Sequence, residues 1–137
     1  MQALLRVLAA GRDVAETARS VVTVELDPER AALARERLRD LSNVELLEGD
    51  ARAMLAGRGP FGLVFADGGG TFRSAASREA VLALVEPGGI LVKDDMTPGR
   101  AAEGDEVREF LLRDPRLAAT EVLATPDMAV IVAVRLR

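Results

Sequence analysis

The sequence is organised around residues 21–30, which read VVTVELDPER. The β-favouring run Val21–Val24 leads into Glu25, and Asp27 followed by Pro28 is typical of the first residues of a helix. A strand that ends on a carboxylate and turns at once into a helix suits ribose recognition. One carboxylate can accept hydrogen bonds from two adjacent hydroxyls at the carboxyl edge of an open α/β sheet. Taken alone, such a stretch is more often a buried strand followed by an Asp-capped helix.

Strand and helix patterns alternate on both sides of this stretch. Residues 3–10 fit either a helix or a short buried strand that ends at Gly11, and Asp13 with Glu16 forms a capping box for a short helix. Further helices are expected at 28–40, 51–56, from Ser74 or Ser77 to 85, and at 105–113; strands are expected at 44–47, 61–66, 90–93, 119–124 and 128–134. The alternation predicts one α/β domain over residues 1–137. Its expected fold is a Rossmann-like doubly wound, mostly parallel sheet with a C-terminal antiparallel hairpin.

Composition restricts the chemistry and the partners. The 137 residues carry a net charge of −4 and contain neither cysteine nor histidine, which excludes disulfides, thiolate nucleophiles, imidazole bases and the usual zinc sites. Nucleic acid is not an expected partner, because the chain is acidic and lacks Trp and Tyr. Residues 1–10 are apolar but too short to span a membrane and show no signal-peptide cleavage pattern. We therefore expect a soluble cytoplasmic protein without a membrane partner.

Acidic residues stand at the ends of four expected strands: Glu25, Asp50, Asp67, and Asp94 with Asp95. In a parallel sheet those ends lie along one edge, so the sequence predicts that the acids converge on one rim. Like charges placed so close together need compensation. Ligand hydroxyls, an adenine amino group, a cationic ligand or a metal ion would supply it.

Four motifs around these acids, in this order and spacing, resemble the class I S-adenosylmethionine-dependent methyltransferases. The motifs are VTVELDP at 22–28, LEGDA at 47–51, LVFAD at 63–67 and PGGILVKDD at 87–95. The chain is most similar to the small-molecule O-methyltransferases of the catechol and caffeoyl-coenzyme A type. The resemblance covers about residues 20–137, and the four motifs together are far more specific than any one of them.

The resemblance implies the roles of the strand-end residues. Glu25, with Leu26 beside it, would bind the ribose hydroxyls of S-adenosylmethionine, and Asp50 with Ala51 would lie against the adenine. Asp67 would lie beside the methionine part of the cofactor and is the candidate catalytic residue. A small-molecule acceptor and a homodimer are also implied.

The resemblance further implies a metal site. Asp67 would bind a divalent ion such as Mg²⁺, a candidate second cofactor, together with Asp94 and Asp95, which match an Asp-Asn pair of the family. In the family the metal binds two neighbouring hydroxyls of the acceptor and favours the alkoxide or phenolate form, which then attacks the sulfonium methyl in line.

Three departures from the family pattern stand out. The glycine-rich loop after the first strand is missing: only Gly11 is left to bind the cofactor there, 14 positions before Glu25 where about 20 are usual. Residues 3–11 are then either a degenerate first strand or the helix that precedes a missing one. Gly70 stands where the family often has a lysine base, and Asp95 replaces an asparagine. Lys93 is the only lysine, and strand alternation predicts that it points away from the acidic pair.

The expected function is transfer of the methyl group of S-adenosylmethionine to an oxygen of a small molecule. A catalytically inactive methyltransferase-like binding or regulatory module is the alternative, and the missing glycine loop favours it. A nicotinamide dinucleotide-binding domain is a second alternative. The absent Gly-x-Gly-x-x-Gly motif, the Pro87-Gly-Gly turn and the terminal hairpin weigh against it.

Overall fold

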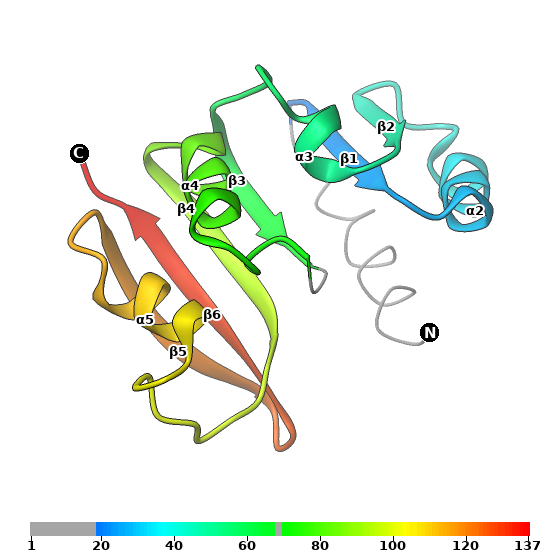
Figure 1. The fold of residues 1–137 in the computed structure, drawn as a ribbon. Helices are drawn as coiled ribbons and strands as arrows, with labels where there is room; N and C mark the ends of the chain where they lie inside the picture. Colours follow the sequence, from blue (N-terminus) through cyan, green and yellow to red (C-terminus); the bar gives the residue numbers. More distant parts are fainter. Residues whose placement is uncertain (1–18, 68–69) are drawn as a thin grey trace. The chain divides into compact units, whose positions relative to one another are not determined.

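The computed structural model describes residues 19–67 and 70–137 (Figure 1). Residues 3–11, including Gly11, and most of the helix expected after Asp13 lie outside the described residues. The chain forms two compact units, which meet in sequence at Ala56 and Gly57. The expectation of a single domain stays a prediction. Within the part of the chain that is described, no helix has the length and apolar character needed to cross a bilayer.

The first unit contains a parallel pair of strands with their helices. It comprises β1 (Val21–Glu25), α2 (Pro28–Leu38), β2 (Val44–Glu48) and α3 (Ala51–Met54). β1 and β2 pair in parallel from Val21 opposite Val44 to Glu25 opposite Glu48. Asp27 caps α2 by accepting a hydrogen bond of 2.9 Å from the Arg30 N–H, as the sequence predicts. Ala31 and Ala34 form the buried stripe of α2.

The second unit is a four-stranded sheet with two helices. Its elements are β3 (Phe61–Ala66), α4 (Ala75–Leu84), β4 (Val85–Met96), α5 (Glu106–Arg113), β5 (Leu117–Thr125) and β6 (Met128–Arg135). The strand order is β3-β4-β6-β5, with β3 parallel to β4 and the other neighbours antiparallel. The C-terminal hairpin β5–β6 is thus confirmed. Figure 1 shows α4 and α5 on the same face of this sheet.

The core of the second unit lies between that face and the two helices. Because side chains alternate along a strand, Val64, Leu91 and Ala133 share one rung of the covered face. They pack with Leu82 of α4 and Leu111 of α5. On the opposite face the apolar side chains of Leu63, Phe65, Ile90 and Val134 are 37–51% exposed in the described part of the chain. The sequence predicts that residues 61–66 are buried on both faces of the sheet. In the described part of the chain, α4 and α5 cover one of these faces.

The turn at 86–89 is built into β4 rather than preceding it. β3 and β4 pair at Phe61–Val85 and again at Leu63–Ile90, so the residues between form a register shift. A Cβ atom on Gly89 would lie 2.9 Å from the carbonyl oxygen of Glu86 and 3.1 Å from that of Phe61. Only glycine therefore fits at this position. The strand expected at 90–93 begins earlier in the structure, at Val85, and ends later, at Met96.

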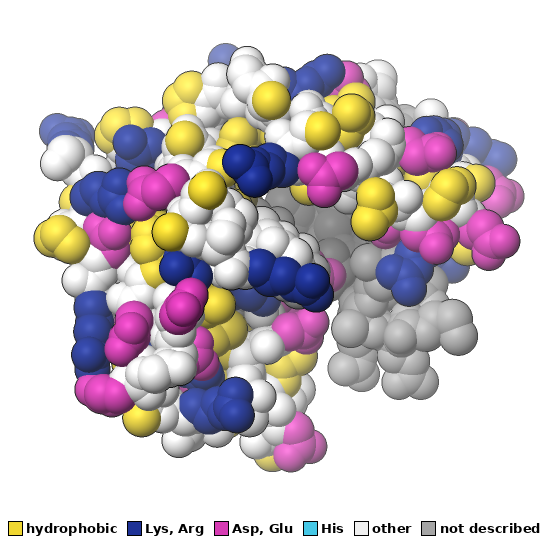
Figure 2. Space-filling model, in the orientation of Figure 1, with side chains coloured by type: hydrophobic (Ala, Val, Ile, Leu, Met, Phe, Trp, Pro, Cys, Tyr) yellow, Lys and Arg dark blue, Asp and Glu magenta, His cyan; other side chains and the backbone are white. Residues whose placement is uncertain are grey.

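Charged side chains of both signs are intermixed on the surface of the second unit, as Figure 2 shows. Arg116 bonds Glu79 at 2.6 Å, and Arg78 bonds Glu106 at 2.9 Å. Exposed pairs such as Arg116–Glu79 contribute little to stability individually. They do, however, break the visible surface into small areas of alternating charge.

Candidate active site

Glu25 is positioned by the turn that follows β1. Its Oε1 accepts a hydrogen bond of 2.9 Å from the backbone N–H of Asp27, and its own carbonyl accepts one of 3.0 Å from Gly49. The adjacent Leu26 is 69% exposed. The turn thus fixes the orientation of the Glu25 carboxylate at the end of β1.

Asp50 lies two residues after the end of β2, at the start of α3. Its Oδ1 accepts a hydrogen bond of 3.0 Å from the Ala53 N–H and caps α3, of which Ala51 is the first residue. β1 and β2 are parallel and in register to their last residues, so Glu25 and Asp50 lie at the same edge of this pair. The structure therefore brings these two predicted cofactor residues to one edge of the first unit.

The remaining acids belong to the second unit. Ala66 pairs with Lys93, so Asp67 and Asp94 occupy adjacent positions at the end of that parallel pair. Asp94 is only 8% exposed, and its Oδ1 accepts a hydrogen bond of 2.8 Å from the Asp95 N–H. The structure thus brings Asp67, Asp94 and Asp95 to one edge. Convergence of this edge with that of the first unit stays a prediction.

These carboxylates do not form a ready metal site. Over residues 19–67 and 70–137, no group of three or more acidic side chains is arranged so that it could hold a metal ion. Asp94 already bonds the backbone N–H of Asp95, and Asp95 is exposed. The donor set expected from Asp67, Asp94 and Asp95 therefore does not fit a bound ion as it stands, and the metal assignment stays a prediction.

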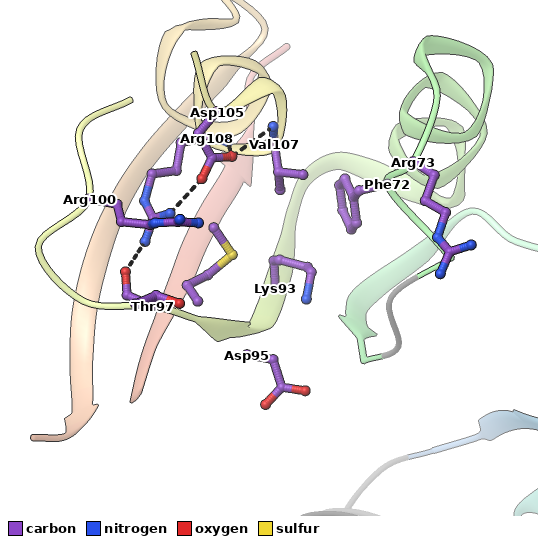
Figure 3. A pocket seen from close by; sticks show the side chains of 10 residues that line it. Phe72, Arg73, Lys93, Asp95, Thr97, Arg100, Asp105, Val107 and Arg108 are labelled. Carbon is purple, nitrogen blue, oxygen red and sulfur yellow. Dashed lines mark hydrogen bonds and ion pairs between the residues drawn. The ribbon is translucent and has the colours of Figure 1, made fainter. Parts of the chain in front are cut away.

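Lys93 lies on the wall of a pocket of about 300 Å³ in the second unit (Figure 3). Its amine donates a hydrogen bond to the Asp94 carbonyl. Burial lowers the pKa of Lys93, and the nearby carboxylates of Asp95, Asp67 and Asp94 partly offset that effect. The expectation that Lys93 points away from the acidic pair is wrong for Asp95, which lines the same pocket. Lys93 and Asp95 are two positions apart in β4, so regular alternation already places them on one face and separates Lys93 from Asp94 alone. Asp95 itself has a left-handed backbone, with φ at +58°.

That backbone conformation gives a test of the strand end. Asp95→Asn should leave the free energy of unfolding within about 0.5 kcal/mol, because Asn tolerates a left-handed φ. Asp95→Val should lower it by about 1–2 kcal/mol, since a branched Cβ clashes with the backbone in this region. Urea unfolding of both variants measures the difference. Equal stability of the two would show that the left-handed turn is not maintained in solution.

Arg108 is a site residue that sequence reasoning missed. It is 1% exposed, and its guanidinium bonds Asp105 at 2.6 Å, Glu121 at 2.8 Å and the carbonyl of Thr97. The hydrogen bond with Glu121 raises the pKa of Arg108 against the opposing effect of burial. A single arginine thus joins α5, β5 and the segment after β4, and it is one of the residues that line the pocket. The pocket lining comprises Phe72, Arg73, Lys93, Asp95, Met96, Thr97, Arg100, Asp105, Val107 and Arg108.

Solved structures identify the class of fold. The chain is similar to the O-methyltransferase TomG from Streptomyces achromogenes, solved with S-adenosylmethionine (TM-score 0.68, 24% identity, 86% of this chain and 62% of that one). It is also similar to a methyltransferase from Geobacter sulfurreducens (0.66, 22%, 86% and 59%) and to an rRNA methylase from Streptococcus thermophilus (0.71, 20%, 90% and 78%). The α/β fold of the class I S-adenosylmethionine-dependent methyltransferases is therefore confirmed.

A family model described as a methyltransferase domain matches residues 2–96. The chain belongs to this methyltransferase family, and the expectation of a transferase enzyme is confirmed. No protein of curated function matches the chain. The chain spans less than two thirds of the length of the first two solved structures above.

Proposed function

We propose that this protein transfers the methyl group of S-adenosylmethionine to an oxygen of a small-molecule acceptor. The observation that carries the proposal is the carboxylate of Glu25, oriented by the Asp27 N–H at the end of a parallel strand of a methyltransferase domain. TomG, which has the same fold, is an O-methyltransferase solved with S-adenosylmethionine. The proposal includes a cytoplasmic location and a homodimer as expectations.

In this proposal the first unit binds the nucleoside part of the cofactor. Glu25 accepts hydrogen bonds from the ribose hydroxyls and Leu26 lies beside it, while Asp50 and Ala51 contact the adenine. The edge shared by Glu25 and Asp50 supports this assignment, because open α/β sheets bind ligands at the carboxyl ends of their strands. Gly11 is the remaining cofactor-binding candidate.

The proposed residue at the reacting end is Asp67. Asp67 follows β3 directly and is proposed to contact the methionine part of the cofactor and the acceptor. The acceptor oxygen attacks the methyl carbon in line, so a C–O bond forms while the C–S bond breaks and the sulfonium becomes a neutral thioether. The hydroxyl proton leaves to a carboxylate, for which Asp67 is the candidate. Positioning and charge compensation by the protein would supply most of the rate.

Glu25→Ala tests the cofactor assignment directly. The variant should bind S-adenosylmethionine about 1–3 kcal/mol more weakly, the scale for a lost hydrogen-bond partner that carries charge. Isothermal titration calorimetry measures the change. Glu36→Ala, an exposed glutamate on α2 of the same unit, is the matched control and should bind normally. Unchanged affinity of Glu25→Ala would remove Glu25 from the ribose site.

A methyltransferase-like module without catalytic activity is the second candidate. The observation that favours it is the missing glycine-rich motif, for which the sequence offers Gly11 alone. The same calorimetric titration separates the two candidates. Failure of the unaltered protein to bind S-adenosylmethionine at millimolar concentration would favour the inactive module, whereas binding favours the enzyme.

A further inference from the structure

Lys93 is a buried cation in an unusual place. It is the only lysine of the chain, and its side chain is 7% exposed. In the sheet register it stands between Ala66 of β3 and Ile131 of β6, which are 5% and 0% exposed. Lysine is almost never buried to this extent without polar or charged neighbours that compensate its charge.

The neighbours of its amine are the acids at the end of the same parallel pair. Lys93 precedes Asp94 and Asp95 in β4, and its partner Ala66 precedes Asp67 in β3. Figure 3 shows Lys93 and Asp95 among the side chains that line the pocket. The amine also donates to the backbone carbonyl of Asp94. The amine therefore lies beside the acidic strand end, where the carboxylates of Asp95, Asp67 and Asp94 act on it electrostatically.

Those three acids are the set expected to hold a divalent ion, yet they do not fit one as they stand. The geometry points to Lys93 as the resident cation of this edge: its ammonium supplies the positive charge among Asp67, Asp94 and Asp95 that a divalent ion would otherwise supply. It follows that methyl transfer by this protein requires no divalent metal.

This inference rests on the proposed function and narrows its acceptor. A divalent ion binds two neighbouring oxygens of one acceptor, whereas an ammonium is a compact point charge that donates separate hydrogen bonds. Lys93 faces the pocket and can donate to one acceptor oxygen there. The acceptor class is therefore a small molecule that presents a single oxygen to Lys93. A pair of adjacent hydroxyls on the acceptor would not strengthen its binding.

Binding of Mn²⁺ to the full chain tests the inference without an acceptor. Electron paramagnetic resonance of free Mn²⁺ is followed for the unaltered protein, for Lys93→Met, which removes the charge and keeps the length, and for Lys93→Arg, which keeps the charge. Lys93→Met should bind one Mn²⁺ at least about tenfold more tightly than the unaltered protein, because removal of the ammonium leaves carboxylates that favour a hard cation. Lys93→Arg should behave as the unaltered protein. Adding Asp94→Asn to Lys93→Met should abolish the gain.

Two results would overturn the assignment. One is stoichiometric Mn²⁺ binding by the unaltered protein that is as tight as that of Lys93→Met; the other is a folded Lys93→Met protein that gains no Mn²⁺ site. Circular dichroism checks folding, and Lys93→Gln replaces the methionine variant if that one does not fold. S-adenosylmethionine binding with and without chelator is measured on the same unaltered sample. If the unaltered protein does not bind S-adenosylmethionine, the proposed function is contradicted. If it binds S-adenosylmethionine normally and also binds Mn²⁺ tightly, only the assignment of Lys93 as the resident cation is contradicted.

Discussion

Arg108→Met is expected to lower the free energy of unfolding by about 3 kcal/mol or more, the scale for removing one partner of a buried ion pair. The methionine fills a similar volume but leaves Asp105 and Glu121, each 22% exposed, without their cation. It also leaves the Thr97 carbonyl without the donor that Arg108 provides. Urea unfolding at neutral pH measures the loss.

The matched control for this substitution is Arg116→Met. Arg116 also bridges two acids, Glu79 and Asp114, but its side chain is 47% exposed. Water and salt screen such a bridge, so the control should lose much less stability. Equal losses of stability in the two variants would show that the buried network around Arg108 stabilises the fold no more than the exposed one around Arg116.

The same network has a pH signature. Burial raises the pKa of Asp105, but hydrogen bonds from the backbone and guanidinium of Arg108 outweigh it and hold the pKa below its ordinary value. A carboxyl whose pKa is lowered by folding contributes stability that is present above its unfolded pKa and is lost as the pH falls through the native pKa. The unaltered protein should therefore lose this contribution below about pH 4, and Arg108→Met should lose less over the same range.

Leu111→Ala is expected to cost about 2–5 kcal/mol, as is usual for a leucine that is truncated in a closed core. Leu111 is 0% exposed and packs from α5 against the covered face of the four-stranded sheet. Leu123→Ala is the matched control: Leu123 lies on β5 and is 68% exposed, so the same truncation should change stability by about 0.5 kcal/mol or less. Urea midpoints of the two variants give the comparison. A small loss at Leu111 would mean that α5 does not pack on the sheet in solution.

Local signals made much of the fold predictable. The strand, cap and helix of residues 21–38 depend on neighbours within a few positions, with Asp27 as the cap and Pro28 at the first turn. The same holds for Ser74, which forms a reciprocal pair of hydrogen bonds with Ser77 at the start of α4. The acids at strand ends were predictable because apolar runs end where a parallel strand leaves the sheet.

Features that depend on residues distant in the sequence could not be predicted from local patterns. Arg108 has the sequence pattern of an ordinary charged helix residue, and its partner Glu121 lies 13 positions away on β5. Lys93 was misplaced because residues two positions apart on a strand share a face, so alternation separates Lys93 from Asp94 but not from Asp95. The apolar run of β3 indicates burial on both faces, but it cannot indicate which residues cover each face.

The bond between Arg108 and the backbone oxygen of Thr97 has a practical meaning for protein engineering. Because the contact uses the main chain, the residue type at 97 does not alter it. A library that varies Thr97 and Arg100 would therefore reshape the pocket lining while the anchor of this segment is retained. Randomising Arg108 itself would sacrifice folding together with pocket shape. Substitutions at Thr97 and Arg100 can thus change acceptor selectivity without loss of folding. Substitutions at Arg108 would change both together.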